Sequence, residues 1–310
     1  MYLKPLQSQT QPVFLPELTA KDVSLFVQRE DLLHPNISGN KYRKLAYNIE
    51  EAKRQGKRQL LTFGGAYSNH ILATASAGNE FGFETIGFIR GDELGLAIDK
   101  TLKSNSTLRA AKDFGMQLRF LSRSDYRMKE EALFLERLQK EYPDAYLLAE
   151  GGSNALAVQG CEAILNKDTS CDVVCVAVGT GATISGIINS TEEGQQVYGF
   201  PALKGGFLES KIREYTADKE QWQLMEAYHF GGYAKTTPEL IAFINAFKAA
   251  TGILLDPVYT AKMMYGVLDL VRKNHFPKGT NILAIHTGGI QGIAGMNALL
   301  AKKGQPLIEV

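Results

Sequence analysis

The sequence lacks long apolar runs and any excess of charge of one sign. No apolar stretch approaches the ~20 residues of a membrane-spanning helix, and the first residues contain no apolar segment typical of a signal peptide. Lysine and arginine total 34 against 33 for aspartate and glutamate, so the formal net charge is +1. Because like charges also form no long runs, we expect a cytoplasmic protein with no nucleic-acid partner and no membrane partner.

Cysteine is scarce as well. Three cysteines do not make the disulfide framework of a secreted domain, and no histidines at ligand spacing accompany them. Cys171 and Cys175 flank a pattern typical of a buried strand. We therefore interpret Cys161, Cys171 and Cys175 as core thiols in a reducing compartment, and we expect no metal site.

What the sequence contains is a repeated order of apolar strand, glycine-rich turn and helix. With 310 residues, 45% of them hydrophobic and 22% charged, the chain has room for two globular domains of ~150 residues each. The pattern predicts strands over 24–31, 59–63, 84–90, 117–121, 145–149, 173–178, 196–200 and 282–286. It predicts helices over 68–81, 105–114, 128–141, 238–250, 261–274 and 293–301.

This alternation predicts an α/β fold with two αβα domains and mostly parallel, open sheets. We expect a smaller domain at residues 45–152, inserted into a larger one made of 1–44 and 153–310. In open sheets of this kind ligands bind beyond the carboxyl ends of the strands. The glycine-rich turns lie at these ends, so they should converge on an active site in a cleft between the domains.

Lys41 is the lysine in the least expected place. It follows a Gly-Asn turn and lies in the first turn of an amphipathic helix, where the helix dipole and the free N–H groups disfavour a positive charge. Such a position lowers the pKa of an amine and makes it a nucleophile or a base. The alternative is an ordinary solvated lysine on the surface.

The turn Gly179-Thr180-Gly181-Ala182-Thr183 offers backbone N–H groups at a helix start together with two hydroxyls, which suits an anion. A P-loop would need Gly-Lys followed by Ser or Thr, which is absent here. A dinucleotide site would need an acidic residue at the end of the next strand, and residues 198–202 contain none. A phosphate monoester fits better, and a tight glycine turn without a ligand remains the alternative.

A second turn carries Ser68, Asn69 and His70. Ser68 can be the N-cap of its helix, but Ser68, Asn69 and the adjacent N–H groups also suit a substrate carboxylate. Asn69 can hydrogen-bond a phenolic oxygen. His70 is either a structural residue or one that supports the substrate site.

Three further positions lie on turns of the second half. Tyr233 lies on a polar glycine turn, where an aromatic core residue is unexpected. Thr260 follows Asp256-Pro257-Val258-Tyr259 and can cap the helix after it. Thr287 lies at the end of the last strand, in His286-Thr287-Gly288-Gly289.

A phosphate cradle, a displaced lysine, a group for a phenolic oxygen and a hydroxyl for a ring nitrogen together describe a site for pyridoxal phosphate, in which the lysine forms the Schiff base and then moves protons. The chain resembles the 1-aminocyclopropane-1-carboxylate deaminase / D-cysteine desulfhydrase family, whose members are fold-type II pyridoxal phosphate enzymes, the type of the tryptophan synthase β subunit. The resemblance covers nearly the whole chain. Its motifs are Gly39-Asn40-Lys41-Tyr42-Arg43-Lys44-Leu45, Gly64-Gly65-Ala66-Tyr67-Ser68-Asn69, Thr180-Gly181-Ala182-Thr183 and Asp256-Pro257-Val258-Tyr259.

The resemblance implies roles for these residues. Lys41 would carry the cofactor, Asn69 would contact its 3-oxygen, and the turn from Gly179 to Thr183 would hold its phosphate. Ser68 would face the substrate as a nucleophile or a carboxylate ligand, with Asn69 and His70 beside it. Tyr233 and Tyr259 would act as proton donors or gates. Members of the family are typically homodimers, so the same is expected here.

Two departures from the deaminases matter for the reaction. The deaminases have glutamate and leucine where this chain has Thr260 and Thr287, and the two threonines resemble the desulfhydrases. A carboxylate beside the ring nitrogen keeps it protonated, whereas a hydroxyl can only donate to or share with a neutral nitrogen. The region between Pro201 and Tyr233 also looks shorter than in the deaminases, so substrate contacts there are not carried over.

The sequence therefore predicts α,β-elimination of a small amino acid, D-cysteine above all, to pyruvate, ammonia and hydrogen sulfide. The alternative is deamination of 1-aminocyclopropane-1-carboxylate to 2-oxobutanoate and ammonia. A more distant alternative is a binding protein that uses the same turns to hold an anion, against which the presence of Lys41 argues.

Overall fold

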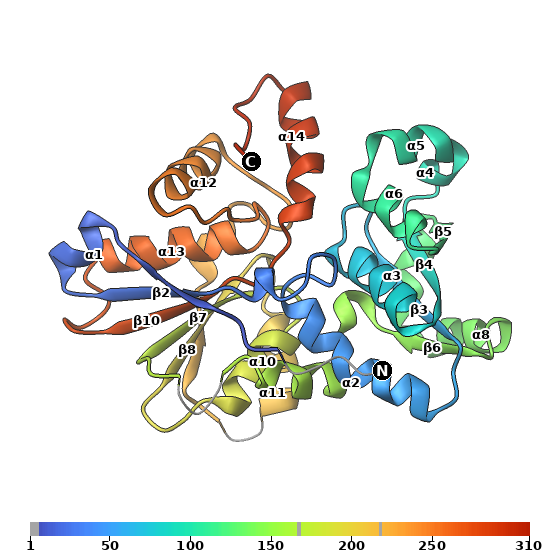
Figure 1. Ribbon diagram of the computed structural model, residues 1–310, viewed down its shortest axis with the longest axis horizontal. Helices are drawn as coiled ribbons and strands as arrows, with labels where there is room; N and C mark the ends of the chain where they lie inside the picture. Colours follow the sequence, from blue (N-terminus) through green and yellow to red (C-terminus); the bar gives the residue numbers. More distant parts are fainter. Residues whose placement is uncertain (1–5, 166–168, 217–218) are drawn as a thin grey trace.

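The computed structural model describes residues 6–165, 169–216 and 219–310. Figure 1 shows two lobes, each built on its own sheet with helices on both faces. The expected α/β fold with two αβα units and mostly parallel sheets is confirmed. Of the helices in the described ranges, none is long and apolar enough to cross a membrane.

The larger lobe is built on a six-stranded sheet. In spatial order its strands are β1 (Thr10–Val13), β2 (Ser24–Gln28), β10 (Asn281–Ile285), β7 (Val173–Val178), β8 (Gln196–Pro201) and β9 (Trp222–Leu224). Neighbouring strands are parallel, except that β1 and β2 are antiparallel. All residues of β7 are buried, as expected for a continuous apolar run covered on both faces.

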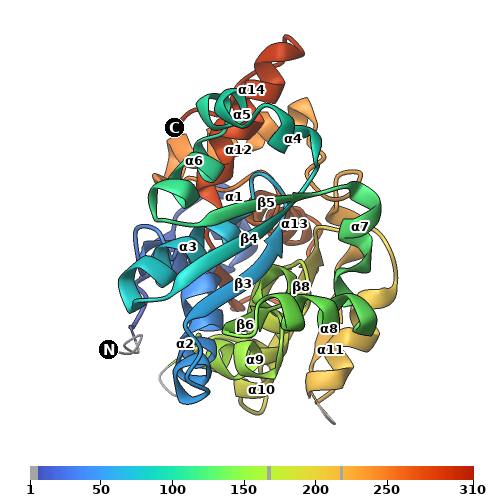
Figure 2. The same cartoon turned by 90° about the vertical axis from the view of Figure 1, so that its right-hand side faces the viewer.

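The smaller lobe is built on a four-stranded, fully parallel sheet, which faces the viewer in Figure 2. Its strands are, in spatial order, β5 (Gln117–Leu121), β4 (Glu84–Arg90), β3 (Gln59–Gly64) and β6 (Ala145–Leu148). Parallel neighbours require crossover connections, which the chain makes through helices.

Helices cover both faces of each sheet. In the larger lobe α1 (Pro16–Lys21), α12 (Pro238–Thr251), α13 (Thr260–Arg272) and α14 (Ile293–Lys302) lie on one side, and α9 (Ala155–Glu162), α10 (Ala182–Ser190) and α11 (Phe207–Thr216) on the other. In the smaller lobe α2 (Asn40–Arg54), α3 (Asn69–Phe81) and α6 (Ser106–Asp113) lie opposite α7 (Arg123–Arg127) and α8 (Ala132–Glu141).

The central strand β7 shows how one run of residues serves both layers. Val173, Cys175 and Ala177 belong to the core under α12 and α13, and the residues between them belong to the core under α10. Successive side chains of a strand point to opposite faces, so an uninterrupted apolar strand forms two cores at once.

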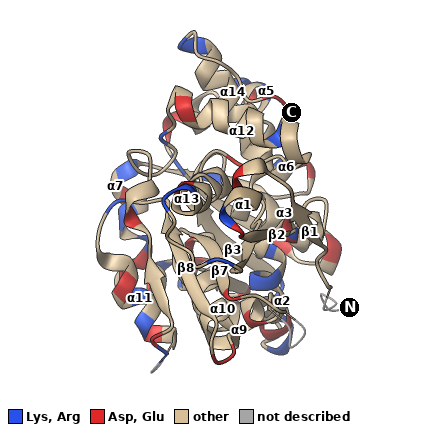
Figure 3. Ribbon diagram, turned by 90° about the vertical axis from the view of Figure 1, so that its left-hand side faces the viewer, with Lys and Arg blue, Asp and Glu red and all other residues tan. Residues whose placement is uncertain are grey.

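Surface charge is mixed. Figure 3 shows lysine and arginine interspersed with aspartate and glutamate over the face that it presents. This distribution agrees with the formal net charge of +1.

Three helices stack at the junction of the lobes by direct backbone contact. A Cβ on Gly160 of α9 would lie 2.1 Å from the carbonyl oxygen of Arg43 in α2, and a Cβ on Gly186 of α10 would lie 2.5 Å from the carbonyl oxygen of Val158 in α9. Only glycine permits such approaches. The order α2, α9, α10 is therefore packed without side chains at these two contact points.

Helix α2 belongs to both lobes. Its apolar residues Tyr42, Leu45, Ile49 and Ala52 join the core of the smaller lobe, while its backbone packs on α9 of the larger one. The expected domain boundaries, after residues 44 and 152, stay a prediction.

Several short elements lie outside the predicted set. The strand predicted over 24–31 ends at Gln28, and the 3-10 helix η1 (Glu30–Leu32) follows it. The helix predicted over 128–141 is divided into η2 (Met128–Glu130) and α8. The elements that were not predicted are β1, α1, α7, α9, α11, β9, α4 (Glu93–Leu96), α5 (Ile98–Ser104), η3 (Glu150–Gly152), η4 (Glu226–Tyr228) and η5 (Ile290–Gly292).

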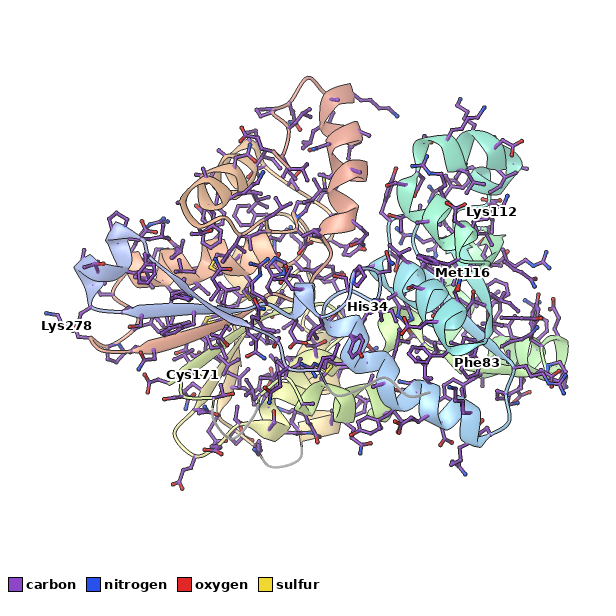
Figure 4. The ribbon with its side chains drawn as sticks, viewed as in Figure 1. His34, Phe83, Lys112, Met116, Cys171 and Lys278 are labelled. Atoms are coloured by element: carbon purple, nitrogen blue, oxygen red, sulfur yellow. The ribbon has the colours of Figure 1, made fainter. Side chains whose placement is uncertain are left out.

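Cys171 corrects one expectation about the thiols. Cys161 and Cys175 are buried, but Cys171 is only partly buried because it precedes β7 on the loop where the strand begins. Figure 4 places it in the larger lobe, away from the smaller one.

The loop before α2 carries the chain to the junction of the lobes. His34, labelled in Figure 4, accepts hydrogen bonds at Nδ1 from the amides of Asn36 and Ile37, and its Nε2 lies 3.2 Å from Glu80 at the end of α3. The loop ends at Gly39, whose φ is 66° and where a Cβ would lie 1.9 Å from the carbonyl oxygen of Thr287. The start of α2 is therefore pressed against the end of β10.

We expect Gly39→Ala to destabilise the protein more than Gly56→Ala. Both glycines have a φ of 66°, but a Cβ at Gly56 meets no atom within 4 Å. The left-handed backbone alone costs about 1–2 kcal/mol for an alanine, and overpacking adds about 1–3 kcal/mol at Gly39. Urea titration of both variants measures the difference in the free energy of unfolding. Equal losses would show that β10 yields to the added methyl group.

Candidate active site

The start of α2 presents Lys41 with a depressed pKa. Gly39 is the N-cap and Lys41 is the second helical residue, as predicted. Its Nζ donates to Asn40 Oδ1 at 3.0 Å. Burial, followed by the charge of Lys44, lowers its pKa to about 7, while Cys161 and Asp256 act weakly in the opposite direction. A substantial fraction of this amine is therefore neutral at physiological pH.

A second lysine, which the sequence analysis did not assign to the site, lies one helical turn further on. The Lys44 side chain is buried, and its Nζ donates to the carbonyl oxygen of Gly151 at 3.1 Å and to Ser153 Oγ at 3.4 Å. Burial lowers its pKa as well. None of the ion pairs within the described ranges includes Lys44, so its charge is available to an anion. Lys44 follows Lys41 by three residues, and this spacing, which places both on the same face of the helix, could have indicated its role in the sequence.

The start of α10 lies against the start of α2. Asn40 Nδ2 donates to Thr183 Oγ1 at 2.8 Å, and Gly181, with a φ of 95°, is the N-cap of α10. The first backbone bond of this helix runs from Ser185 N to Gly181 O. The amides before Ser185, including those of Ala182 and Thr183, therefore have no acceptor within the helix and suit an anionic ligand.

Two hydroxyls link this loop to the loop after η3. Thr180 and Ser153 are hydrogen-bonded, and Ser153 also receives the bond from Lys44. The loop at Gly179 to Thr183 thus lies within two hydrogen bonds of a buried ammonium group. This combination suits a phosphate dianion better than a bare glycine turn does.

Cys161 of α9 completes the buried surroundings of the two lysines. Its thiol is hydrogen-bonded with Thr183, and burial raises its pKa to about 11 in spite of Lys44. The thiol is therefore neutral. Its burial was expected from the sequence, but its place beside the two lysines was not.

The predicted substrate turn lies at the start of α3. Ser68 is the N-cap, and its Oγ accepts from the amide of Ile71 at 3.4 Å, so the capping role is confirmed. Asn69 Nδ2 donates to the carbonyl oxygen of Ser38, the residue before Gly39. The turn is therefore tied to the loop that carries Lys41, and its roles toward substrate and cofactor stay predictions.

His70 is buried and has one free ring nitrogen. Thr62 donates its hydroxyl hydrogen to the carbonyl oxygen of Leu148, so His70 Nε2, 2.8 Å from that hydroxyl, carries the hydrogen between them. Nδ1 then has a lone pair with no partner among the described residues and lies against Gly152. Burial, Lys41 and Lys44 hold the pKa of His70 well below its usual value, so the ring is neutral.

Two tyrosines of the larger lobe, Tyr233 and Tyr259, face each other beside the turn at Gly179. The ring centroids of Tyr233 and Tyr259 are 6.1 Å apart with 66° between the ring planes, and a Cβ on Gly179 would lie 3.1 Å from the Tyr259 ring. Partial desolvation raises the pKa of the Tyr233 phenol, although 48% of this residue's surface is exposed, and burial raises that of Tyr259 far above its usual value. Both phenols are therefore protonated at neutral pH and can donate a proton.

Charged residues of the smaller lobe act on these tyrosines. Glu150, after β6, accepts from Tyr126 at 2.7 Å and pairs with Lys129 at 3.3 Å. Its charge and that of Arg90, the last residue of β4, both influence the pKa of Tyr233. The two residues lie at the carboxyl ends of parallel strands, so strand order was the signal that could have found them.

Thr260 is not the cap of α13. It is the first helical residue, and the Asp256 carboxylate accepts the amides of Val258, Tyr259 and Thr260 instead. Thr260 is fully buried, and its hydroxyl donates to Asp256 Oδ1 at 2.8 Å while accepting from the Asp256 amide at 2.9 Å. The single hydrogen of this hydroxyl is therefore directed to Asp256, so the expected donation to a ring nitrogen would require Asp256 to release it.

Thr287 lies two residues after the end of β10 and next to the start of α2. Its carbonyl oxygen accepts from the amide of Asn40 at 3.3 Å, and the residue is nearly buried. Thr287 therefore neighbours Lys41 through the backbone, while its contact with a substrate stays a prediction.

These residues fit pyridoxal phosphate. The free amides of α10 and the ammonium of Lys44 suit its phosphate, the low-pKa amine of Lys41 suits its aldehyde, and the neutral Nδ1 of His70 leaves an acceptor at the same site. No group of three or more His, Cys, Asp or Glu residues in the described ranges could hold a metal ion.

The similarity to known proteins extends over most of the chain. Residues 3–288 match the family model of the pyridoxal-phosphate dependent enzymes. A putative 1-aminocyclopropane-1-carboxylate deaminase of Pyrococcus horikoshii is 31% identical over 90% of this chain and 89% of its own length. A bifunctional D-cysteine desulfhydrase/1-aminocyclopropane-1-carboxylate deaminase of Arabidopsis thaliana, named as mitochondrial, is 32% identical over 87% of this chain and 73% of its own.

Two further proteins with names of the same kind are similar over most of this chain. The D-cysteine desulfhydrase of Klebsiella pneumoniae is 27% identical over 86% of each chain. The crystal structure of a homologue of 1-aminocyclopropane-1-carboxylate deaminase superposes with a TM-score of 0.81 at 28% identity and covers 97% of this chain and 94% of its own. The chain therefore belongs to the pyridoxal-phosphate dependent enzymes, in the family of the 1-aminocyclopropane-1-carboxylate deaminases and D-cysteine desulfhydrases.

Proposed function

We propose that the enzyme converts D-cysteine and water to pyruvate, ammonia and hydrogen sulfide. The observation that carries this proposal is the threonine pair, Thr260 and Thr287, in place of the glutamate and leucine of the deaminases that the chain resembles. The Thr260 hydroxyl brings no charge of its own to a ring nitrogen. Loss of a good leaving group such as thiolate demands less electron withdrawal than opening an unactivated cyclopropane.

The residues at the junction of the lobes support this reaction. Bound pyridoxal phosphate would supply the electron sink for bonds to the substrate Cα. Lys41, whose pKa is about 7, is suited to take the Cα proton in its neutral form. The start of α3, with Ser68 and Asn69, is suited to bind the substrate carboxylate.

The two tyrosines are suited to the leaving group. Because the phenols of Tyr233 and Tyr259 stay protonated at neutral pH, either can donate a proton to the departing sulfur. In the elimination the electron pair of the Cβ–S bond leaves with sulfur, so that a proton is needed to release hydrogen sulfide.

Deamination of 1-aminocyclopropane-1-carboxylate is the second candidate. The name of the relative from Pyrococcus horikoshii favours it, and the name of the relative from Arabidopsis thaliana includes both activities. Incubation with D-cysteine, L-cysteine, D-serine and the cyclopropane substrate, followed by identification of the keto acid, distinguishes the two reactions. A wild-type enzyme that forms 2-oxobutanoate faster than pyruvate would overturn our choice. A non-catalytic anion-binding protein is not retained, because the chain belongs to a family of enzymes.

We also propose a homodimer in the cytoplasm. The dimer rests on the resemblance to the family. The location rests on the composition of the chain, in which three cysteines are all unpaired.

Lys41 should carry the cofactor. After borohydride reduction, peptide mapping should find the pyridoxyl group on Lys41 and not on Lys44, whose ammonium already donates to two acceptors. Cofactor uptake by the apoenzyme should rise with pH, with a midpoint of about 7, because the neutral amine is the nucleophile. Lys44→Met should move this midpoint upward, since the charge of Lys44 lowers the pKa of Lys41. Label on Lys44, or an unmoved midpoint, would contradict the assignment.

The phosphate should bind at the start of α10. Gly181→Val should weaken cofactor affinity at least tenfold, about 1.4 kcal/mol, because a side chain there constrains the N-cap turn. Gly194→Val is the matched control. Gly194 lies in the turn after α10 with a φ of 90°, and a Cβ added there would meet no atom within 4 Å. Equilibrium titration of both apoenzymes measures the affinities. Equal affinities in the two folded variants would place the phosphate elsewhere.

The threonine pair should set the choice of reaction. Thr260→Glu combined with Thr287→Leu should lower D-cysteine turnover and raise formation of 2-oxobutanoate, because a carboxylate raises the pKa of a nearby ring nitrogen by about one to three units. Thr260→Gln with Thr287→Leu is the control of equal size without the charge. Steady-state kinetics on both substrates separate charge from shape. If the two double variants behave alike, the charge at residue 260 does not decide the reaction.

A further inference from the structure

One buried lysine is not used by the proposed chemistry. Lys262, in the first turn of α13, has 1% of its surface exposed. Its Nζ donates to the carbonyl oxygens of His229 and Gly232 at 2.9 and 2.8 Å. No ion pair within the described ranges includes it, so two backbone carbonyls are its partners in place of a carboxylate. A buried ammonium group is costly unless such bonds satisfy it.

The two carbonyls belong to an unusual turn. Residues 230–234 contain four positive φ angles, at Phe230 (52°), Gly231 (89°), Gly232 (111°) and Ala234 (53°). Two of these residues are not glycine, so the backbone of the turn is strained and must be held by its surroundings. Tyr233, one of the two proposed proton donors, lies inside this turn.

Helix α13 holds the segment at three points. Besides Lys262, the ring of Tyr265 packs edge-on against Phe230 with centroids 4.9 Å apart, and Asp269 accepts from Tyr228 at 2.7 Å. Of these contacts, the one from Lys262 reaches the carbonyl directly before Tyr233. The same helix begins immediately after Tyr259, the partner of Tyr233.

We propose that Lys262 is a positioning residue, whose buried ammonium group fixes the turn at 229–234 and thereby holds the Tyr233 ring against the ring of Tyr259. The proposal rests on the proposed function in one respect, the use of these two phenols as proton donors. Without the ammonium, the carbonyls of His229 and Gly232 lose their shared donor and the strained turn relaxes. Tyr233 then no longer meets Tyr259 in a fixed geometry, while no hydrogen bond among the described residues joins Lys262 to Lys41 or to the start of α10.

The surroundings of Lys262 give the effect a pH dependence. Burial lowers its pKa to about 8, and Asp256 opposes this shift. Three nearby titratable groups are engaged with partners of their own: Tyr228 with Asp269, Tyr265 with Glu239, and His229 Nδ1 with the amide of Gly231. The side chains of Lys235 and Lys204 also lie beside the turn, next to Gly231 and Gly232. Lys262 therefore becomes neutral as the pH rises through about 8, and the turn should loosen in that range.

The test is hydrogen exchange of residues 229–235 in the holoenzyme. Lys262→Met keeps the length of the side chain and removes the charge, and it should speed exchange in this segment at least tenfold at pH 7. Lys262→Arg, which keeps a charge, should restore part of the protection. Lys278→Met is the control, since Lys278 is exposed and lies at the far end of the larger lobe in Figure 4. Unchanged protection in Lys262→Met would overturn the proposal.

Kinetics and pH separate this proposal from the proposed function. Lys262→Met should lower kcat on D-cysteine at least tenfold with an unchanged KM and unchanged cofactor absorbance. In the wild type, protection of the segment, corrected for intrinsic exchange, should fall between pH 7 and 9. If Lys262→Met does not fold, the wild-type measurement decides. Protection of the segment that stays constant from pH 7 to 9 would refute the proposal that Lys262 fixes the turn. Faster exchange in Lys262→Met together with full activity of a Tyr233→Phe variant would support the role of Lys262 in fixing the turn and would reject Tyr233 as a proton donor.

Discussion

Everything in this site depends on positive charge buried at the start of one helix without a carboxylate to balance it. Arg43 shows the ordinary solution, since its guanidinium is buried against Glu30 at 2.9 and 3.0 Å. Its neighbours Lys41 and Lys44 have no carboxylate partner among the residues that the structure describes, and burial lowers the pKa of both. One face of a single helical turn thus holds a structural ion pair, and the other holds two amines that can serve a ligand. The dipoles of α2 and α10 add to the same positive field.

The arrangement of strands could largely be predicted, and so could the turns that follow them. The run of β7, the N-cap at Ser68 and the helix start at Lys41 are local features, and local periodicity and capping chemistry identify them. Lys44 and Lys262 could not be predicted as buried, because lysine is ordinarily exposed and its burial depends on contacts with distant carbonyls. The hydrogen bond from the Thr260 hydroxyl to Asp256 was not predicted either, because only the conformation of the turn brings the two side chains together.

The two lobes contribute different things to the junction. The larger lobe supplies the start of α10, the threonine pair and the two tyrosines, which lie at helix starts or in turns next to its sheet. The smaller lobe supplies the start of α3, Glu150 and Arg90, which lie at the ends of a separate sheet. Groups suited to hold the cofactor thus lie mainly with the larger lobe and with α2, and groups suited to meet the rest of the substrate come from both.

The glycine contacts in the stack of α2, α9 and α10 limit how such a site can diverge. Gly160 and Gly186 set the spacing of the three helices with backbone atoms, so no series of larger or smaller side chains can widen or narrow it by degrees. The distance between the start of α2, which carries the lysines, and the amides at the start of α10 is therefore fixed in any protein that keeps these two glycine contacts. New substrate preferences on this scaffold would have to arise at the ends of the small sheet and in the turns, where a substitution leaves that length unchanged.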